Sequence, residues 1–125
     1  MERILIVEDE PLIAMMLSDW VIELGKLPVG PVGRVSEALD LIGSTTVDAA
    51  LVDVNLLHER SDAVAAMLAE RQIPFALTTG ESGDSHYPQH GHLATLPKPY
   101  DFESLQKVIE ALCRAGSGSH PAKCS

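Results

Sequence analysis

Short apolar runs alternate with helix-like segments five times along this 125-residue chain. Each run has four to six residues, the length of a buried strand, and the runs cover residues 3–7, 27–30, 48–53, 74–78 and 92–96. In most of the segments that follow them, apolar residues recur at the spacing of a helix face. This alternation predicts an α/β domain in which a five-stranded parallel sheet is covered by helices on both faces.

Several residues mark where the helices begin and end. Pro11 suits the first position of a helix and Gly25 its end, while Ser36 and Asp101 can each cap a later helix. The stretch 81–90 contains a glycine and a proline and hardly any apolar residues. We therefore expect the fourth helix to be short or mobile, because such a segment has little to bury.

Length and charge narrow the class of protein. The chain suits one folded domain, which we place at residues 1–115, and the Gly- and Ser-rich stretch 116–125 has the composition of a disordered C-terminal tail. A net charge of −9 and nine scattered Lys and Arg residues argue against a nucleic-acid partner. No apolar stretch is long enough for a membrane span or a signal peptide, so we expect a cytoplasmic protein without membrane contact.

Polar residues follow four of the five predicted strands. Glu8 and Asp9 come after the first, Asp53 ends the third, Thr79 follows the fourth and Lys98 follows the fifth. The carboxyl ends of parallel strands meet at one edge of a sheet, so three carboxylates, a hydroxyl and an ammonium should share one crevice. Such a group of side chains indicates a site for phosphate and a metal ion.

The acidic residues suit Mg²⁺ or Mn²⁺, which prefer oxygen ligands and keep positions open for water and phosphate. Asp9 and Asp53 would supply carboxylates, Asn55 its backbone carbonyl, and Glu8 a contact through water. The alternative is that Glu8 and Asp9 only begin a helix, where carboxylates offset the positive end of the macrodipole.

Asp53 is the candidate nucleophile, because carboxylates form aspartyl phosphates when a metal ion and hydrogen-bond donors offset the developing charge. Thr79 would donate a hydrogen bond to a phosphoryl oxygen, and Lys98 would contribute a positive charge to the same group. Each of the three also has an ordinary alternative, as a strand-end carboxylate, a strand-packing threonine or a solvated lysine.

Taken in order, these strand-end residues resemble the motifs of the receiver domain of two-component response regulators: Glu8-Asp9, Asp53, Thr79-Gly80 and Lys98-Pro99. The resemblance covers residues 1–115. It implies a flavodoxin-like fold with strand order 2-1-3-4-5 and Mg²⁺-dependent transfer of a phosphoryl group from a histidine kinase or phosphotransfer protein to Asp53. It also implies a stand-alone signalling switch without an output domain, in which Thr79 moves toward the phosphate.

By the same resemblance the chain would not be an enzyme, beyond catalysing its own phosphorylation and dephosphorylation. Asn55 and Glu81, each two positions after a site residue, would flank the water that hydrolyses the phosphate. The chain would be a monomer or a weak phosphorylation-dependent dimer, with a downstream protein target as a further partner. One departure is Thr95, which stands where receivers commonly have an aromatic residue three positions before the lysine.

Two other functions remain as alternatives. A degenerate receiver would bind partners without phosphorylation, but the acids, Thr79 and Lys98 are all present. A phosphohydrolase of the haloacid-dehalogenase kind also uses a strand-end aspartate, but it needs a second aspartate two residues later, where this chain has Asn55.

Overall fold

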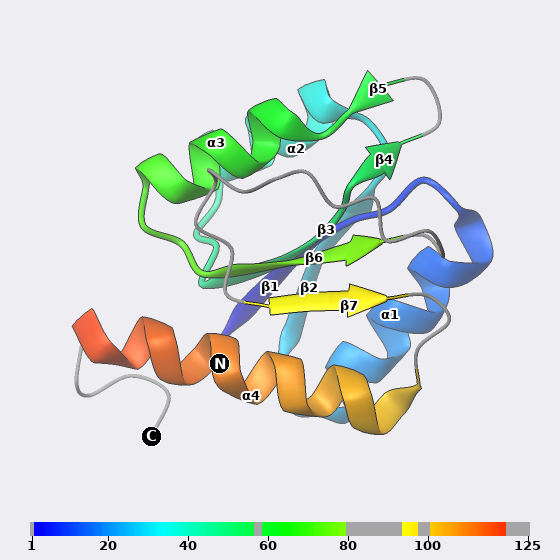
Figure 1. Cartoon of the computed structure of the whole chain (residues 1–125), viewed down its shortest axis with the longest axis vertical. Helices are drawn as coiled ribbons and strands as arrows, with labels where there is room; N and C mark the ends of the chain where they lie inside the picture. Colours follow the sequence, from blue (N-terminus) through cyan, green and yellow to red (C-terminus); the bar gives the residue numbers. More distant parts are fainter. Residues whose placement is uncertain (1, 57–58, 80–93, 98–100, 120–125) are drawn as a thin grey trace.

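In the part of the chain that the structure describes, five parallel strands form one sheet, and four helices cover its two faces (Figure 1). The computed structural model describes residues 2–56, 59–79, 94–97 and 101–119. The strands are β1 (Arg3–Val7), β2 (Leu27–Val32), β3 (Ala49–Asp53), β6 (Phe75–Thr79) and β7 (Ala94–Pro97). Their spatial order is β2-β1-β3-β6-β7, which confirms the expected order 2-1-3-4-5.

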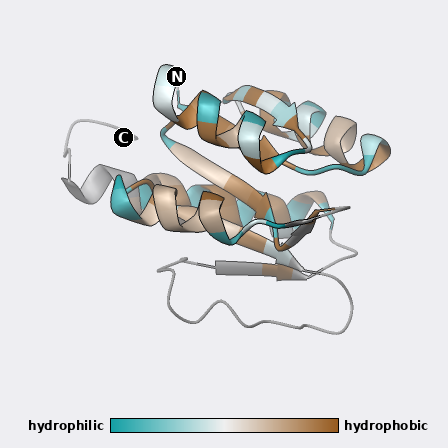
Figure 2. Ribbon diagram, turned by 90° about the horizontal axis from the view of Figure 1, so that it is seen from above, coloured by the Kyte–Doolittle hydropathy of each residue, from teal (hydrophilic) through white to brown (hydrophobic). Residues whose placement is uncertain are grey.

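The helices pair up on opposite faces of the sheet. They are α1 (Pro11–Glu23), α2 (Val35–Ser44), α3 (Asp62–Glu70) and α4 (Phe102–Ser119). In Figure 1, α2 and α3 lie above the sheet, and α1 and α4 lie below it. Teal and brown residues alternate along the helices in Figure 2, as expected for elements with one face toward the core and one toward solvent.

The sheet divides the hydrophobic core into two clusters. Because successive side chains of a strand point to opposite faces, β3 sends Ala49 and Leu51 toward α1 and α4, and Ala50 and Val52 toward α2 and α3. All five β3 residues are buried. At the α1–α4 contact, Trp20 packs edge-on against Phe102 with ring centroids 5.7 Å apart, so Trp20 serves helix packing.

Most predicted helix boundaries are confirmed. Pro11 begins α1, and Gly25, with a φ of +81°, lies just beyond its end. Asp101 caps α4 by accepting a hydrogen bond from the Ser104 backbone N–H at 2.8 Å, which lowers the pKa of Asp101 below its ordinary value.

Two boundaries differ from the prediction. Helix α2 begins at Val35, after Arg34, so Ser36 is not its cap; Val35 packs on the core, and burying it favours the earlier start. Helix α4 runs to Ser119, although residues 116–125 were expected to form a disordered tail. The helix can extend in this way because each added residue gains a hydrogen bond once a helix is formed. Residues 120–125 and the segment 81–90, with the predicted short or mobile fourth helix, lie outside the described residues.

One small element was not predicted at all. The chain after β3 forms a two-stranded antiparallel hairpin, β4 (Asn55–Leu56) and β5 (Glu59–Arg60), before α3 begins. Strands of two residues leave no readable periodicity in a sequence.

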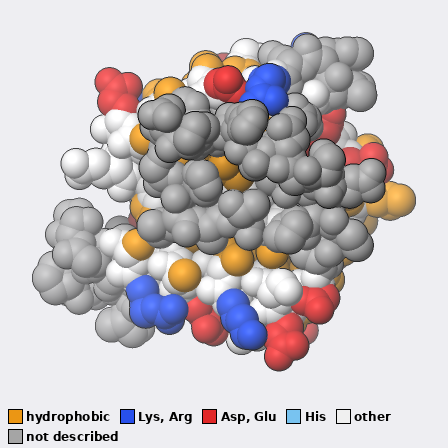
Figure 3. All heavy atoms as spheres, viewed as in Figure 1, with side chains coloured by type: hydrophobic (Ala, Val, Ile, Leu, Met, Phe, Trp, Pro, Cys, Tyr) orange, Lys and Arg blue, Asp and Glu red, His pale blue; other side chains and the backbone are white. Residues whose placement is uncertain are grey.

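The face of the molecule drawn in Figure 3 carries side chains of both charges. On the face drawn in Figure 3, the described Lys and Arg side chains are separated, with acidic ones close by. None of the helices in the described ranges is both long and apolar enough to cross a membrane.

Candidate functional site

Three carboxylates converge at the carboxyl edge of the sheet. Asp53 is the last residue of β3, and Glu8 and Asp9 directly follow β1, the neighbouring strand. One oxygen from each side chain lies within 4.8 Å of one oxygen from each of the other two. Glu8 and Asp53 are only 3% and 5% exposed, whereas Asp9 is half-buried. The structure thus brings together the three acidic residues that the strand-end argument selected.

The parallel register explains this convergence. Val7 of β1 lies beside Val52 of β3, so the next residue on each strand carries an acid to the same edge. The Glu8 backbone N–H donates to the Val32 carbonyl at 2.9 Å, and this bond holds the chain in line with β2 as it leaves the sheet. The Glu8 side chain in turn accepts the Glu10 N–H at 3.1 Å through Oε2, just ahead of α1.

The electrostatics of this arrangement favour a bound cation. At an effective dielectric constant of about 20, two like charges 4.8 Å apart repel by on the order of 3 kcal/mol. A hard divalent cation with oxygen ligands would convert that repulsion into attraction, and two or three carboxylates beside open positions are a donor set that Mg²⁺ accepts. The residues present therefore fit Mg²⁺ or Mn²⁺.

Gly33 packs closely against one side of the acidic cluster. A β-carbon on Gly33, in the turn between β2 and α2, would lie 3.2 Å from both the Cα and the Cβ of Asp9. It would also lie 3.7 Å from the Glu8 carbonyl oxygen. Asp9 therefore owes its position partly to the absence of a side chain at residue 33.

The remaining predicted site residues are placed only by their backbone or not at all. Thr79 is the last residue of β6 and lies in register with Pro97 of β7, and Asn55 begins β4. The side chains of Thr79 and Asn55 are not among those described. Lys98 and Glu81 lie outside the described residues, and the side chain of Thr95, in β7, is likewise not described.

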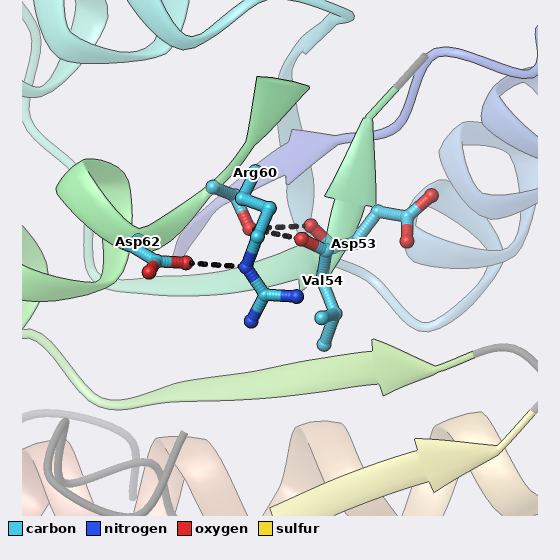
Figure 4. Close-up of polar contacts among 5 residues, drawn as sticks. Asp53, Val54, Arg60 and Asp62 are labelled. Carbon is cyan, nitrogen blue, oxygen red and sulfur yellow. Dashed lines mark hydrogen bonds and ion pairs between the residues drawn. The ribbon is translucent and has the colours of Figure 1, made fainter. Parts of the chain in front are cut away.

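A buried serine that the sequence analysis did not select contacts the end of β3. The Ser61 hydroxyl lies 2.6 Å from the Asp53 carbonyl oxygen and 3.1 Å from that of Val54, and the residue is fully buried (Figure 4). Its place before an apolar helical pattern would have indicated only a helix cap.

The neighbouring Arg60 forms an ion pair with Asp62. In Figure 4 its guanidinium points away from the Asp53 carboxylate, and its Nε lies 3.2 Å from the Asp62 carboxylate. Both side chains of this pair are largely exposed, so it adds little to stability.

Comparisons with known proteins agree with the fold. No protein-family model matches the chain. SdrG from Sphingomonas melonis, whose solution structure is known, is 46% identical, with a TM-score of 0.79 over 90% of this chain and 96% of that one. The transcriptional regulatory protein PdtaR of Mycobacterium tuberculosis is 31% identical over 112 residues, or 86% of this chain.

More distant structures share the fold. The CheY-like response regulator receiver domain from Methylobacillus flagellatus is 24% identical, with a TM-score of 0.78 over 90% of this chain and 98% of that one. The chain belongs to the receiver domains of two-component response regulators. It spans about half of PdtaR, 55% of that protein's length.

Proposed function

We propose that this chain is a phosphorylation-controlled signalling switch that accepts a phosphoryl group on Asp53 from a histidine kinase or a phosphotransfer protein. The observation that carries the proposal is the convergence of Asp53 with Glu8 and Asp9 within 4.8 Å at the sheet edge. Two further acids would not stabilise a strand-end aspartate that only packs, whereas a phosphoacceptor that works with a metal ion requires such ligands.

Each described acid has a part in this proposal. The Asp53 carboxylate attacks phosphorus, so a P–O bond to Asp53 forms as the bond from phosphorus to the donor breaks. Asp9 and Asp53, with the Asn55 backbone carbonyl, would hold Mg²⁺ or Mn²⁺, and Glu8 would contribute through water. The ion, when bound, offsets the negative charge of the phosphoryl oxygens. A magnesium ion is coordinated in the active-site cleft of the PA1611 receiver domain from Pseudomonas aeruginosa, which is 21% identical to this chain and has a TM-score of 0.78.

The other predicted residues complete the switch in this proposal. Thr79 and Lys98 contact the transferred phosphoryl group, and Asn55 and Glu81 flank the water that later removes it. The chemistry of the chain is then limited to gaining and losing its own phosphoryl group.

The first turns of α1 are the proposed docking surface for the phosphodonor protein. A donor must reach Asp53, so its surface has to cover the rim of the acidic cluster, where α1 begins two residues after Asp9. Leu12 and Met15 expose 73% and 58% of their surface there, one helical turn apart. Large exposed apolar side chains beside a reaction site favour a transient protein contact.

Intact-mass measurement after incubation with Mg²⁺ and acetyl phosphate tests the proposal. We expect one phosphoryl group per chain in the parent, none without Mg²⁺, and none in Asp53→Asn. Continuous phosphate release with no adduct on Asp53 would instead indicate a phosphohydrolase. An unlabelled parent under all conditions would indicate a receiver that works without phosphorylation.

A further inference from the structure

Ser61 joins α3 to the strand end that carries Asp53. Besides the hydroxyl contacts at 2.6 and 3.1 Å, the Ser61 backbone N–H donates to the Val54 carbonyl at 3.3 Å. A serine hydroxyl has one proton, so its shorter contact, with the Asp53 carbonyl, is the better hydrogen bond. Ser61 thus contacts the carbonyl of Asp53, the last residue of β3, and the carbonyl of Val54, the residue directly after it.

The direction of this hydroxyl is unusual for its position. Ser61 precedes the first residue of α3, where a serine side chain ordinarily accepts a bond from the helix's own N–H groups. Here it makes no such capping bond and donates backward across eight residues to Asp53. The short β4–β5 hairpin makes this possible, because it returns the chain to the end of β3.

We propose that Ser61 is a positioning residue for the metal and phosphoryl site. Its hydroxyl fixes the peptide groups after Asp53, and therefore fixes both the approach of the Asp53 carboxylate to Glu8 and Asp9 and the path by which the chain enters Asn55. The inference deepens the proposed function and rests on it for the identity of the metal ion.

A hydroxyl that acts in this way should affect metal affinity beyond its effect on stability. Groups that orient metal ligands typically change affinity by 10- to 100-fold when removed. We expect Ser61→Ala, which removes the donor without adding volume, to raise the Kd for Mg²⁺ about tenfold. Ser61→Thr keeps the donor, and so should keep the Kd within about threefold of the parent, on the same scale.

Two control variants separate positioning from general destabilisation. Val64→Ala removes buried volume from α3, where Val64 is fully buried, and leaves the Ser61 hydroxyl in place. Ser44→Ala removes another bond from a serine hydroxyl to a carbonyl, the 2.8 Å contact with Asp40 at the exposed end of α2. We expect Val64→Ala to lower Tm and Ser44→Ala to change it little, and both to bind Mg²⁺ as the parent does.

The experiment titrates the parent and these variants with Mg²⁺ alone, following backbone amide signals of Glu8 and Asp53 by NMR. Amide hydrogen exchange of Val54 and Ser61 is measured in the same proteins without metal, where we expect faster exchange in Ser61→Ala than in Ser61→Thr. A parent that binds no Mg²⁺ would overturn the proposed function, and faster exchange in Ser61→Ala would still show the backbone role of the hydroxyl. A parent that binds Mg²⁺, with Ser61→Ala binding equally well or Val64→Ala losing as much affinity, would overturn the positioning role alone.

Discussion

Gly33 and Asp9 approach so closely that a β-carbon on Gly33 would lie 3.2 Å from the Asp9 Cα. That separation is shorter than ordinary van der Waals contact, so Asp9 or the turn must shift by a few tenths of an ångström if residue 33 gains a side chain. A metal site tolerates little such movement, because its ligands are held to distances within about 0.2 Å.

Gly33→Ala should therefore weaken Mg²⁺ binding several-fold while the sheet stays folded. Gly43→Ala is the matched control: Gly43 lies in α2 with open space around it, and an alanine there should stabilise the protein by about 0.5–1 kcal/mol. Calorimetric titration with Mg²⁺ and thermal melts of both variants check the prediction. Equal Mg²⁺ affinity in the two proteins would show that the turn yields without moving Asp9.

Removing two of the clustered charges should stabilise the metal-free protein. Glu8→Gln with Asp9→Asn relieves repulsion within the cluster, and we expect the free energy of unfolding to rise by about 1–3 kcal/mol and Mg²⁺ binding to be lost. Urea unfolding with and without Mg²⁺ measures both effects. A double variant that Mg²⁺ still stabilises as it does the parent would locate the ion elsewhere.

The proposed docking surface on α1 can be tested apart from the chemistry of Asp53. Leu12→Ser with Met15→Ser removes exposed apolar surface and should leave stability nearly unchanged. We expect transfer from a cognate kinase to slow at least about tenfold, the scale of 1.4 kcal/mol of lost binding. Labelling by acetyl phosphate should stay at the parent rate.

Ile22→Ser is the control for this surface, because Ile22 is 57% exposed on the same helix but near its far end. Equal slowing of kinase transfer by Ile22→Ser would mean that the contact is spread along α1. Unchanged kinase transfer in the Leu12 and Met15 variant would move the docking surface away from this helix.

We expect the cap of α4 to give the protein a pH-dependent increment of stability. The Ser104 backbone N–H, followed by the Ser104 side chain, lowers the pKa of Asp101 below its ordinary value of 3.8. Because the folded-state pKa is the lower one, the increment is present above the unfolded value and is lost as pH falls through the folded value.

Asp101→Asn keeps a capping side chain without the charge, so its Tm should lie below the parent's near neutral pH, with the gap closing under acid conditions. Melts at a series of pH values provide the test. High salt should narrow the gap only in part, because the hydrogen bonds from Ser104 act at short range and contribute more to the lowered pKa than Lys107 does. A difference in Tm that stayed constant down to acid pH would show that it does not depend on the ionisation of Asp101.

The sheet and the acidic cluster could be predicted because both follow from strand ends. Strand order came from the resemblance, whereas the meeting of Glu8, Asp9 and Asp53 required only that the strands be parallel. Ser61 could not be found in this way, since its bond to Asp53 depends on a hairpin whose two-residue strands are too short to show a period. The start of α2 was misplaced for a related reason: packing of Val35 on the core outweighed the capping preference of Ser36.

The division of the core by the sheet has a consequence for how a signal could spread. Leu51 and Val52 are neighbours in the chain, yet they belong to separate clusters that meet different pairs of helices. Substitutions on the two faces should therefore be nearly additive in stability, because no side chain is shared between them. Strand β3 contributes side chains to both clusters, and Asp53 is the last residue of this strand. A small shift of that end of β3 would therefore change how the strand packs against all four described helices.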